Sequence, residues 1–360
     1  MRKYKNMQAL MQELLLLAVQ NNSSDLHLMV GAAPIFRNVG RLEVYNQAGV
    51  LDAEKSMSLV TSLMTPDQKE TYLKNLELDF SVSLPGRARF RANAYFQKGT
   101  PAISLRYIPD KIPTIDELKL PSICHNVAKL KQGFVLITGP TGSGKSSTFA
   151  SIIDEINNTR SEHIITIEDP VEFVHENKRS FISQREMETD TRSWGAALKS
   201  VLREDPNIVY IGEMRDPETV AAAMTTAETG HLVFATLHTN SAAQTVERIV
   251  DTFPENQQSQ VVLQLSMVLE AVVSQRLVPT KDDKRVVAAE IMIVTPAVRN
   301  TIREGKSFQI DNIIQTSGNI GMRLMEQSLA ELVNRGIVDR TVAFEYSIRP
   351  SILEKLLGNG

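Results

Sequence analysis

The sequence has 360 residues, enough for two or three domains, and 42% of them are apolar, enough for a large buried core. The formal net charge is -3, so composition gives no electrostatic case for nucleic acid as a partner. The single cysteine, Cys124, excludes a disulfide within the chain and a cysteine-rich zinc site.

Residues 1–107 predict a small α+β sheet domain. Residues 7–21 indicate a short amphipathic helix, whose longest apolar run, Leu14–Val19, has six residues, whereas a membrane span needs about 20. The remaining patterns predict strands at 23–28, 34–44, 79–84, 87–97 and 101–107, and helices at 52–64 and 66–76. We therefore expect no transmembrane segment, and a cytoplasmic protein that meets a membrane only through a partner.

Residues 108–121 predict a linker, because prolines stand there among polar residues. Residues 122–360 predict a larger α/β domain, in which apolar runs recur at 134–137, 163–167, 208–211 and 232–237. The runs alternate with helical or loop segments, which predicts a parallel sheet with helices on both faces. From about residue 251 the sequence favours a mainly helical C-terminal region.

A glycine-rich turn follows the first apolar run. Residues 139–146 match the phosphate-loop pattern G-x-x-x-x-G-K-S between a strand and a helix, and a flexible turn is the alternative. Such a backbone can aim its N–H groups at phosphate, Lys145 can reach the β- and γ-phosphates of ATP, and the Ser146 hydroxyl can bind Mg²⁺. The residues expected to bind nucleotide are Gly139, Pro140, Thr141, Gly142, Ser143, Gly144, Lys145, Ser146 and Ser147.

An acid follows two of the apolar runs. Glu213 follows 208–211, where phosphate-loop proteins keep a carboxylate linked to Mg²⁺, and it can also act as the general base for hydrolysis. Glu168 follows 163–167, and because parallel strands end at one edge of the sheet, we expect it to orient water or Mg²⁺. A solvated acid at a strand end is the alternative for Glu213.

Histidines stand at both ends of the run 232–237. His238, at the C-terminal end, is better placed to sense phosphate, and His231 is the second candidate. A structural role is the usual one for a lone histidine. Joint metal ligation is disfavoured, because the strand holds the two rings roughly 20 Å apart.

Four arginines gather near the end of the first domain: Arg87, Arg89, Arg91 and Arg106. Alternation places the first three on one side of a strand, so a solvated face is the plain alternative. Because the guanidinium fork grips phosphate oxygens, we expect at least one of the four to contact nucleotide, in its own chain or a neighbour. Arg91 and Arg106 are the candidates.

Several segments, in order, resemble the secretion and type IV pilus ATPases. They are similar to the Walker A motif, the Asp box, the Walker B motif and the His box of that family, at 139–146, 167–170, 202–206 with 212–216, and 229–240. Ser24–Leu28 resembles the start of the family's N-terminal domain. The resemblance implies a PAS-like N-terminal domain and a RecA-like ATPase domain with a helical C-terminal part.

Residues 295–304 resemble the signature Ala-Ile-Arg-Asn-Leu-Ile-Arg-Glu of the pilus retraction ATPases, with departures at Val298 and Thr301. At helical spacing one face of this segment can be buried. We expect Arg299 and Arg303 to stay available on another face and to pass ATP-driven motion to a partner or to the neighbouring subunit. An ordinary amphipathic surface helix is the alternative.

The resemblance thus implies a homo-hexameric cytoplasmic motor that hydrolyses ATP with Mg²⁺ to power type IV pilus retraction in twitching motility. Its implied partner is the inner-membrane platform protein of the pilus machine. The alternatives are an accessory retraction ATPase, a secretion-type ATPase, or a nucleotide switch with little turnover. A nucleic-acid motor is disfavoured, because the sequence is mildly acidic and shows no Lys/Arg-rich tract.

Overall fold

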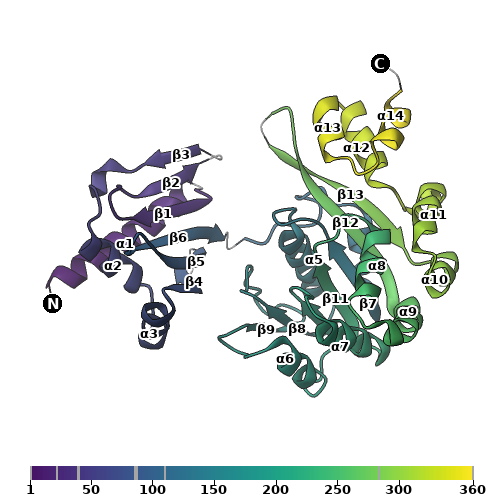
Figure 1. Ribbon diagram of the computed structural model, residues 1–360, viewed down its shortest axis with the longest axis horizontal. Helices are drawn as coiled ribbons and strands as arrows, with labels where there is room; N and C mark the ends of the chain where they lie inside the picture. Colours follow the sequence, from purple (N-terminus) through teal and green to yellow (C-terminus); the bar gives the residue numbers. More distant parts are fainter. Residues whose placement is uncertain are drawn as a thin grey trace. The chain divides into compact units, whose positions relative to one another are not determined.

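The computed structural model describes residues 2–21, 23–38, 41–84, 88–108, 111–282 and 284–358. The chain divides into two compact units, Met1–Lys111 and Ile112–Gly360 (Figure 1). These units confirm the predicted fold class of a sheet domain followed by a larger α/β domain. Among the described residues, no helix combines the length and the apolar character needed to cross a bilayer.

The first unit is an antiparallel sheet packed against helices. Its described strands lie in the order β3-β2-β1-β6-β5-β4. Along β5, the residues Phe90, Ala92 and Ala94 are buried and pack in one cluster with Leu14 and Leu15 of the first helix. The elements are α1 (Arg2–Gln20), β1 (Asp25–Met29), β2 (Ile35–Asn38), β3 (Arg41–Val44), η1 (Asn46–Ala48), α2 (Ala53–Thr61), α3 (Pro66–Asn75), β4 (Glu77–Leu84), β5 (Ala88–Gln97) and β6 (Thr100–Ile108). Within a few residues, they match the predicted helices and strands.

The second unit is built on a sheet with the strand order β13-β12-β7-β11-β10-β8-β9. The strands from β12 to β9 pair in parallel, and β13 adds an antiparallel edge strand. The strands are β7 (Gly133–Thr138), β8 (His163–Glu168), β9 (Phe181–Glu186), β10 (Ile208–Ile211), β11 (Leu232–Leu237), β12 (Leu269–Pro279) and β13 (Arg285–Ile293). The helices are α4 (Ile123–Val127), α5 (Lys145–Thr159), α6 (Trp194–Val201), α7 (Pro217–Glu228), α8 (Ala242–Asp251), α9 (Glu255–Val268), α10 (Pro296–Arg303), η2 (Ser307–Gln309), α11 (Ile310–Thr316), η3 (Gly318–Ile320), α12 (Met325–Asn334), α13 (Arg340–Tyr346) and α14 (Pro350–Leu357).

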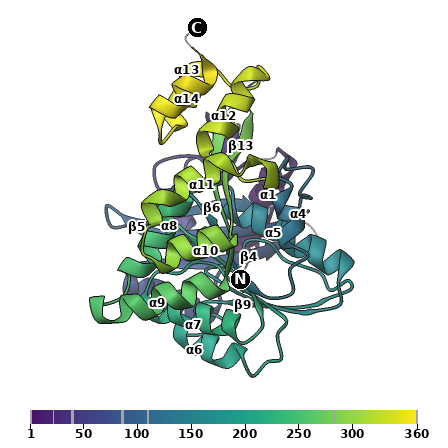
Figure 2. The ribbon, with the colours of Figure 1, turned by 90° about the vertical axis from the view of Figure 1, so that its right-hand side faces the viewer.

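Helices cover both faces of this sheet, as predicted. On one face Val135 and Ile137 of β7 pack with Phe149 of α5. On the other face Phe134 and Leu136 pack in a cluster with α6 to α11. Figure 2 shows α8, α9, α10 and α11 together, on the side of the sheet away from α5. Because both faces are buried, the central strands are continuous apolar runs.

Strands β9, β12 and β13 were not predicted. The pair β12–β13 interrupts the region from residue 251 that we expected to be mainly helical, although α9 to α14 occupy the rest of it. Val272, Val273 and Val278 of β12 are buried on the two sides of the strand. Such a stretch lacks the alternation of a half-exposed strand, so periodicity alone cannot tell it from a buried helix.

The predicted linker, 108–121, packs partly into the second unit. Ile115 is 2% exposed and lies in the cluster that holds Phe149. The Ser151 hydroxyl of α5 donates a hydrogen bond to the carbonyl oxygen of Pro113 at 2.7 Å. Pro109 lies outside the described residues.

Candidate functional site

The carboxyl ends of the central parallel strands meet at one edge of the second unit's sheet. Ile211 of β10 is in register with Ile167 of β8 and Ala235 of β11, and Leu237 of β11 is in register with Thr138 of β7. The groups that end or follow these strands are therefore brought to one edge: the phosphate loop, Glu168, Glu213 and His238.

The phosphate loop joins β7 to α5. Its glycines adopt backbone angles that other residues rarely adopt, with φ of 143° at Gly139, 77° at Gly142 and 87° at Gly144. A side chain at Gly139 would also place its Cβ 2.3 Å from the carbonyl oxygen of Gln275. The rim of the loop is exposed, whereas Ser143 is buried. The sequence therefore fixes a curled backbone at the start of α5, the geometry of an anion-binding loop.

Lys145 closes over this loop. Its ammonium donates hydrogen bonds to the carbonyl oxygens of Gly139 at 2.8 Å and Pro140 at 3.2 Å. Burial lowers the pKa of Lys145, while the charges of Glu213 and Glu172 act in the opposite direction. The cation thus lies at the loop, within the field of two acids from other elements.

The Glu213 carboxylate lies between the side chains of Arg215 and His238. One carboxylate oxygen accepts a hydrogen bond from Arg215 at 2.7 Å, and the other lies 3.2 Å from Nε2 of His238. The turn that carries Glu213 is pinned to β11, because the Met214 N–H donates to the carbonyl oxygen of Thr236 at 3.2 Å. Burial opposes ionisation, but Arg215, His238 and Lys145 together lower the pKa of Glu213, so the group is ionised at neutral pH.

Glu168 has the opposite environment. It is buried at the end of β8, and one of its oxygens accepts hydrogen bonds from Thr166 at 2.7 Å and Gln184 at 3.1 Å. Burial raises the pKa of Glu168 to about 7, although both hydrogen bonds oppose the shift. Glu168 therefore changes its charge near neutral pH.

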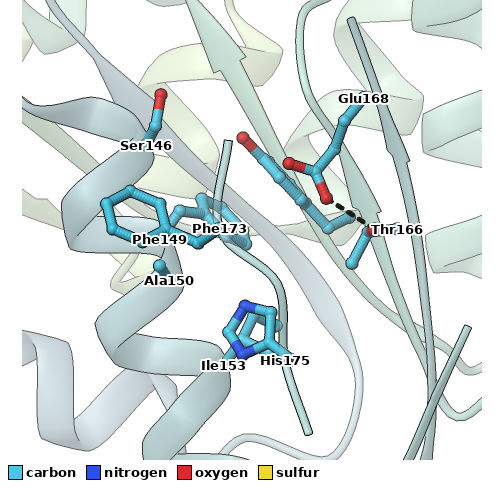
Figure 3. A pocket seen from close by; sticks show the side chains of 9 residues that line it. Ser146, Phe149, Ala150, Ile153, Thr166, Glu168, Phe173 and His175 are labelled. Carbon is cyan, nitrogen blue, oxygen red and sulfur yellow. Dashed lines mark hydrogen bonds between the residues drawn. The ribbon is translucent and has the colours of Figure 1, made fainter. Parts of the chain in front are cut away.

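A small cavity lies between β8 and α5 (Figure 3). Ser146 lines it from α5 and Glu168 from β8, and the ring of Phe173 borders it. His175 also lines the cavity, and burial lowers its pKa to about 4. The predicted Mg²⁺ ligand Ser146 and the acid Glu168 thus border one cavity. No group of three or more His, Cys, Asp or Glu side chains among the described residues could hold a metal ion.

His231 lies at the opposite edge of the sheet. Its neighbour Leu232 is in register with Gly133, at the start of β7 rather than at the phosphate loop. The Nδ1 atom of His231 lies 3.0 Å from the carbonyl oxygen of Thr226 and 3.0 Å from the hydroxyl of Thr229. Within this chain, the structure therefore does not bring His231 to the phosphate loop.

The candidate arginines belong to the first unit. Arg91 and Arg106 are direct partners across β5 and β6, and Nε of Arg106 lies 3.1 Å from a carboxylate oxygen of Asp25. Arg89 shares the less buried side of β5 with Arg91, as alternation predicted. Arg87 lies outside the described residues. A nucleotide contact by Arg91 or Arg106 stays a prediction.

The retraction-like segment forms α10. Val298 and Ile302 are buried, as predicted, and Arg303 is exposed. Arg299 is not available, because it donates to the carbonyl oxygens of Ser266 and Met267 at the end of α9. This correction follows from the helix packing: α10 lies against α9, whose last carbonyl groups need partners.

Two polar residues near the site were missed from the sequence. Gln184 of β9 holds Glu168, and Gln275 of β12 contacts the phosphate loop. Both lie on strands that were not predicted. Recognising β12 as a buried strand would have singled out Gln275, because an uncharged polar residue in such a strand needs hydrogen-bond partners.

A family model described as a type II/IV secretion system protein matches residues 4–319. The chain belongs to this family. Family membership agrees with the phosphate loop and with the strand-end acids described above.

Three relatives illustrate the similarity. A twitching motility protein of Neisseria gonorrhoeae is 52% identical over 289 residues, 80% of this chain and 77% of the relative. The type IV pilus retractation ATPase PilT of Pseudomonas aeruginosa is 46% identical over 333 residues, 92% of this chain and 96% of the relative. The type IV pilus ATPase PilU of the same organism is 38% identical over 326 residues, 90% of this chain and 85% of the relative.

A solved structure agrees with these relatives. The crystal structure of the pilus retraction motor PilT with bound ADP has a TM-score of 0.89 and 44% sequence identity. The similarity covers 95% of this chain and 98% of that one. Both units of this chain therefore have counterparts in a nucleotide-binding motor.

Proposed function

We propose that this chain is a motor ATPase that hydrolyses ATP to power type IV pilus retraction. The observation that carries the chemistry is the convergence of the phosphate loop, Glu213 and His238 at one sheet edge. The retraction role rests on the similarity to PilT at 46% identity. An accessory role is less supported, because PilU is 38% identical.

Residues 139–147 bind the nucleotide phosphates in this proposal. The N–H groups of the loop and of the first turn of α5 supply donors, and the helix N-terminus adds partial positive charge. Lys145 exchanges its hydrogen bonds to Gly139 and Pro140 for bonds to the β- and γ-phosphates. The exchange replaces neutral acceptors with charged ones, which make stronger hydrogen bonds.

The oxygen donors at this edge fit Mg²⁺. Ser146 and Glu213 are the proposed ligands, and Mg²⁺ in such sites is usually held by one or two protein oxygens together with substrate phosphates. When bound, the ion neutralises charge on the phosphates. Glu213 is also the proposed general base, because its carboxylate is ionised at neutral pH, the form that can accept a proton, and it follows the strand end next to the phosphate loop.

Glu168 and His238 support that base. His238 lies against the Glu213 carboxylate, so it orients Glu213 and can respond to the γ-phosphate next to it. Glu168 orients the attacking water from the neighbouring strand end. If Glu213 proves dispensable, Glu168 is the next candidate for the base, because its pKa of about 7 is close to the working pH.

The proposal extends to assembly. We infer a homo-hexamer in the cytoplasm that is held at the inner membrane by binding the platform protein of the pilus machine. Arg91 and Arg106 then contact nucleotide held by their own or a neighbouring subunit. A size measurement in solution, with and without ATP, tests this part, and a monomer that hydrolyses ATP at full rate would contradict it.

Deletion of the gene tests the function. Cells that lack the protein should carry pili but fail to retract them, and the purified protein should release phosphate from ATP continuously. Retraction at nearly normal frequency in the deletion strain would favour the accessory role. Binding of ATP without turnover would favour a nucleotide switch, and strong stimulation by DNA would favour a nucleic-acid motor.

A further inference from the structure

Gln275 is a buried polar residue that contacts the phosphate loop from the neighbouring strand β12. Its side-chain amide nitrogen donates a hydrogen bond to the carbonyl oxygen of Ser143 at 2.8 Å. Its amide oxygen accepts a hydrogen bond from the Thr148 hydroxyl of α5 at 3.0 Å. Gln275 is 1% exposed, Ser143 3% and Thr148 1%. One side chain thus joins the loop and the first turns of α5 to β12, away from water.

The hydrogen bond to Ser143 sets the direction of the next amide. In a trans peptide the C=O group and the following N–H group point in opposite directions. Because Gln275 draws the carbonyl of Ser143 toward β12, the N–H of Gly144 must point away from β12. That N–H is one of the donors that a phosphate-binding loop uses.

Thr148 fixes which end of the Gln275 amide faces the loop. Because the Thr148 hydroxyl donates to the amide oxygen, the nitrogen is left to face Ser143. A glutamate here would present a second acceptor to that carbonyl, and a methionine would present none of the required groups. The backbone of residue 275 is held by its neighbours, since Gln275 is in register with Ala289 of β13 and the preceding Ser274 with Thr138 of β7.

The loop is packed directly against this residue. A Cβ at Gly139 would lie 2.3 Å from the carbonyl oxygen of Gln275, and one at Gly144 would lie 3.4 Å from its amide nitrogen. Two loop glycines therefore lie close to Gln275. Movement of this part of β12 would move the surface on which the loop rests.

We propose that Gln275 is a positioning residue that presets the Gly144 amide for phosphate binding. This inference rests on the proposed phosphate site at residues 139–147. The loop amides bind phosphate before and during the reaction, so their loss affects substrate binding more than the chemical step. Gln275→Met should therefore weaken ADP binding about tenfold and raise KM for ATP similarly, with kcat changed less than about threefold.

The test is an ADP titration of the full-length protein by calorimetry, together with steady-state ATP hydrolysis. The matched control is Ser274→Ala, which removes the 2.8 Å hydrogen bond between Thr138 and Ser274 on the same two strands. Ser274 and Thr138 are fully buried, so the control loses a comparable bond that does not touch the loop. It should lower thermal stability without weakening ADP binding.

Lys145→Ala separates the inference from the site on which it rests. If Lys145→Ala loses turnover while Gln275→Met binds ADP normally, the phosphate site stands and the role of Gln275 is overturned. If both Lys145→Ala and Gln275→Met keep wild-type turnover and ADP binding, the proposed phosphate site itself is overturned. If Ser274→Ala weakens binding as much as Gln275→Met, the effect belongs to strand stability and the role is again overturned.

A second pair of variants, at Thr148, tests the inference if Gln275→Met does not fold. Thr148→Val removes the group that orients the Gln275 amide, whereas Thr148→Ser keeps the hydroxyl. ADP binding should be about threefold weaker in Thr148→Val than in Thr148→Ser. Equal affinities in the two variants would overturn the inference.

Discussion

Arg299 and Arg303 lie one turn apart on α10, and their surroundings predict different effects of mutation. Arg299 donates to the carbonyl oxygens of Ser266 at 2.9 Å and Met267 at 2.8 Å, and its Nη2 lies 2.6 Å from Glu270. The two carbonyl acceptors belong to the last turn of α9, where carbonyl groups have no partner within the helix and a cation is favourable. Arg299 therefore acts as a cap that ties α10 to α9.

The magnitude of the cap follows from these contacts. A hydrogen bond from a charged donor is worth about 1.5–3 kcal/mol when buried. The Arg299 side chain is 25% exposed, so water would replace part of what is lost. We expect Arg299→Ala to lower the free energy of unfolding by about 2 kcal/mol, which is about 4–8 °C in Tm for a unit of this size. Arg303→Ala should cost less than about 0.5 kcal/mol, because that residue is exposed.

Thermal unfolding of the two single variants checks this contrast, and assays of ATPase activity and pilus retraction complete it. Arg303→Ala should keep its fold and ATPase activity but lose retraction, if α10 passes motion to a partner. Equal Tm losses in the two variants would refute the assignment of Arg299 as a cap. Retraction at normal speed in Arg303→Ala would refute the coupling role.

Three further predictions concern the site. Lys145→Ala should nearly abolish phosphate release, because the one loop cation is lost, and wild-type rates in this variant would contradict the proposed site. Glu213→Gln should bind ATP but hydrolyse it about 10²- to 10⁴-fold more slowly, since an amide cannot accept the proton, and a loss below about tenfold would transfer the role to Glu168. The folded state raises the pKa of Glu168 from 4.5 to about 7, so the unfolded chain ionises first as the pH rises. The free energy of unfolding therefore falls as the pH rises above 4.5, and the loss is complete above pH 7. Denaturant unfolding at pH 5 and pH 8 checks this: the free energy of unfolding of Glu168→Gln, relative to that of the wild type, should rise by about 2.5 kcal/mol between the two pH values. A difference between the two proteins that does not depend on pH would contradict this.

The first unit could be predicted almost completely from local patterns. The alternation along β5 buries Phe90, Ala92 and Ala94, and a half-buried sheet leaves that period in the sequence. The strand β12 was missed because it lacks this alternation. Buried on both sides, it shows no alternation, and a valine-rich stretch in a helical region was not recognised as a strand.

The part of the site that follows the ends of the predicted strands could be predicted from the sequence. The phosphate loop, Glu168, Glu213 and His238 each follow a predicted strand, so a parallel sheet was enough to bring them together. His231 stands at the wrong end of its strand for the same geometry. A local pattern cannot predict contacts between segments that are distant in the sequence. The contact of Gln275 with the phosphate loop and the contact of Arg299 with the end of α9 are both of this kind.

Two neighbouring residues of β12, Gln275 and Arg276, each contact segments that are distant in the sequence. Gln275 holds the phosphate loop, while Arg276 donates to the side-chain oxygen of Asn240 at 3.1 Å and to the carbonyl oxygen of Tyr346 at 3.0 Å. Asn240 follows the His238 segment, and Tyr346 ends α13 near the C-terminus. Because adjacent residues of one strand carry both sets of contacts, a shift of the loop that moves this end of β12 must also strain the contacts to the C-terminal helices. The strand that contacts the phosphate loop is thus joined directly to α13 near the C-terminus.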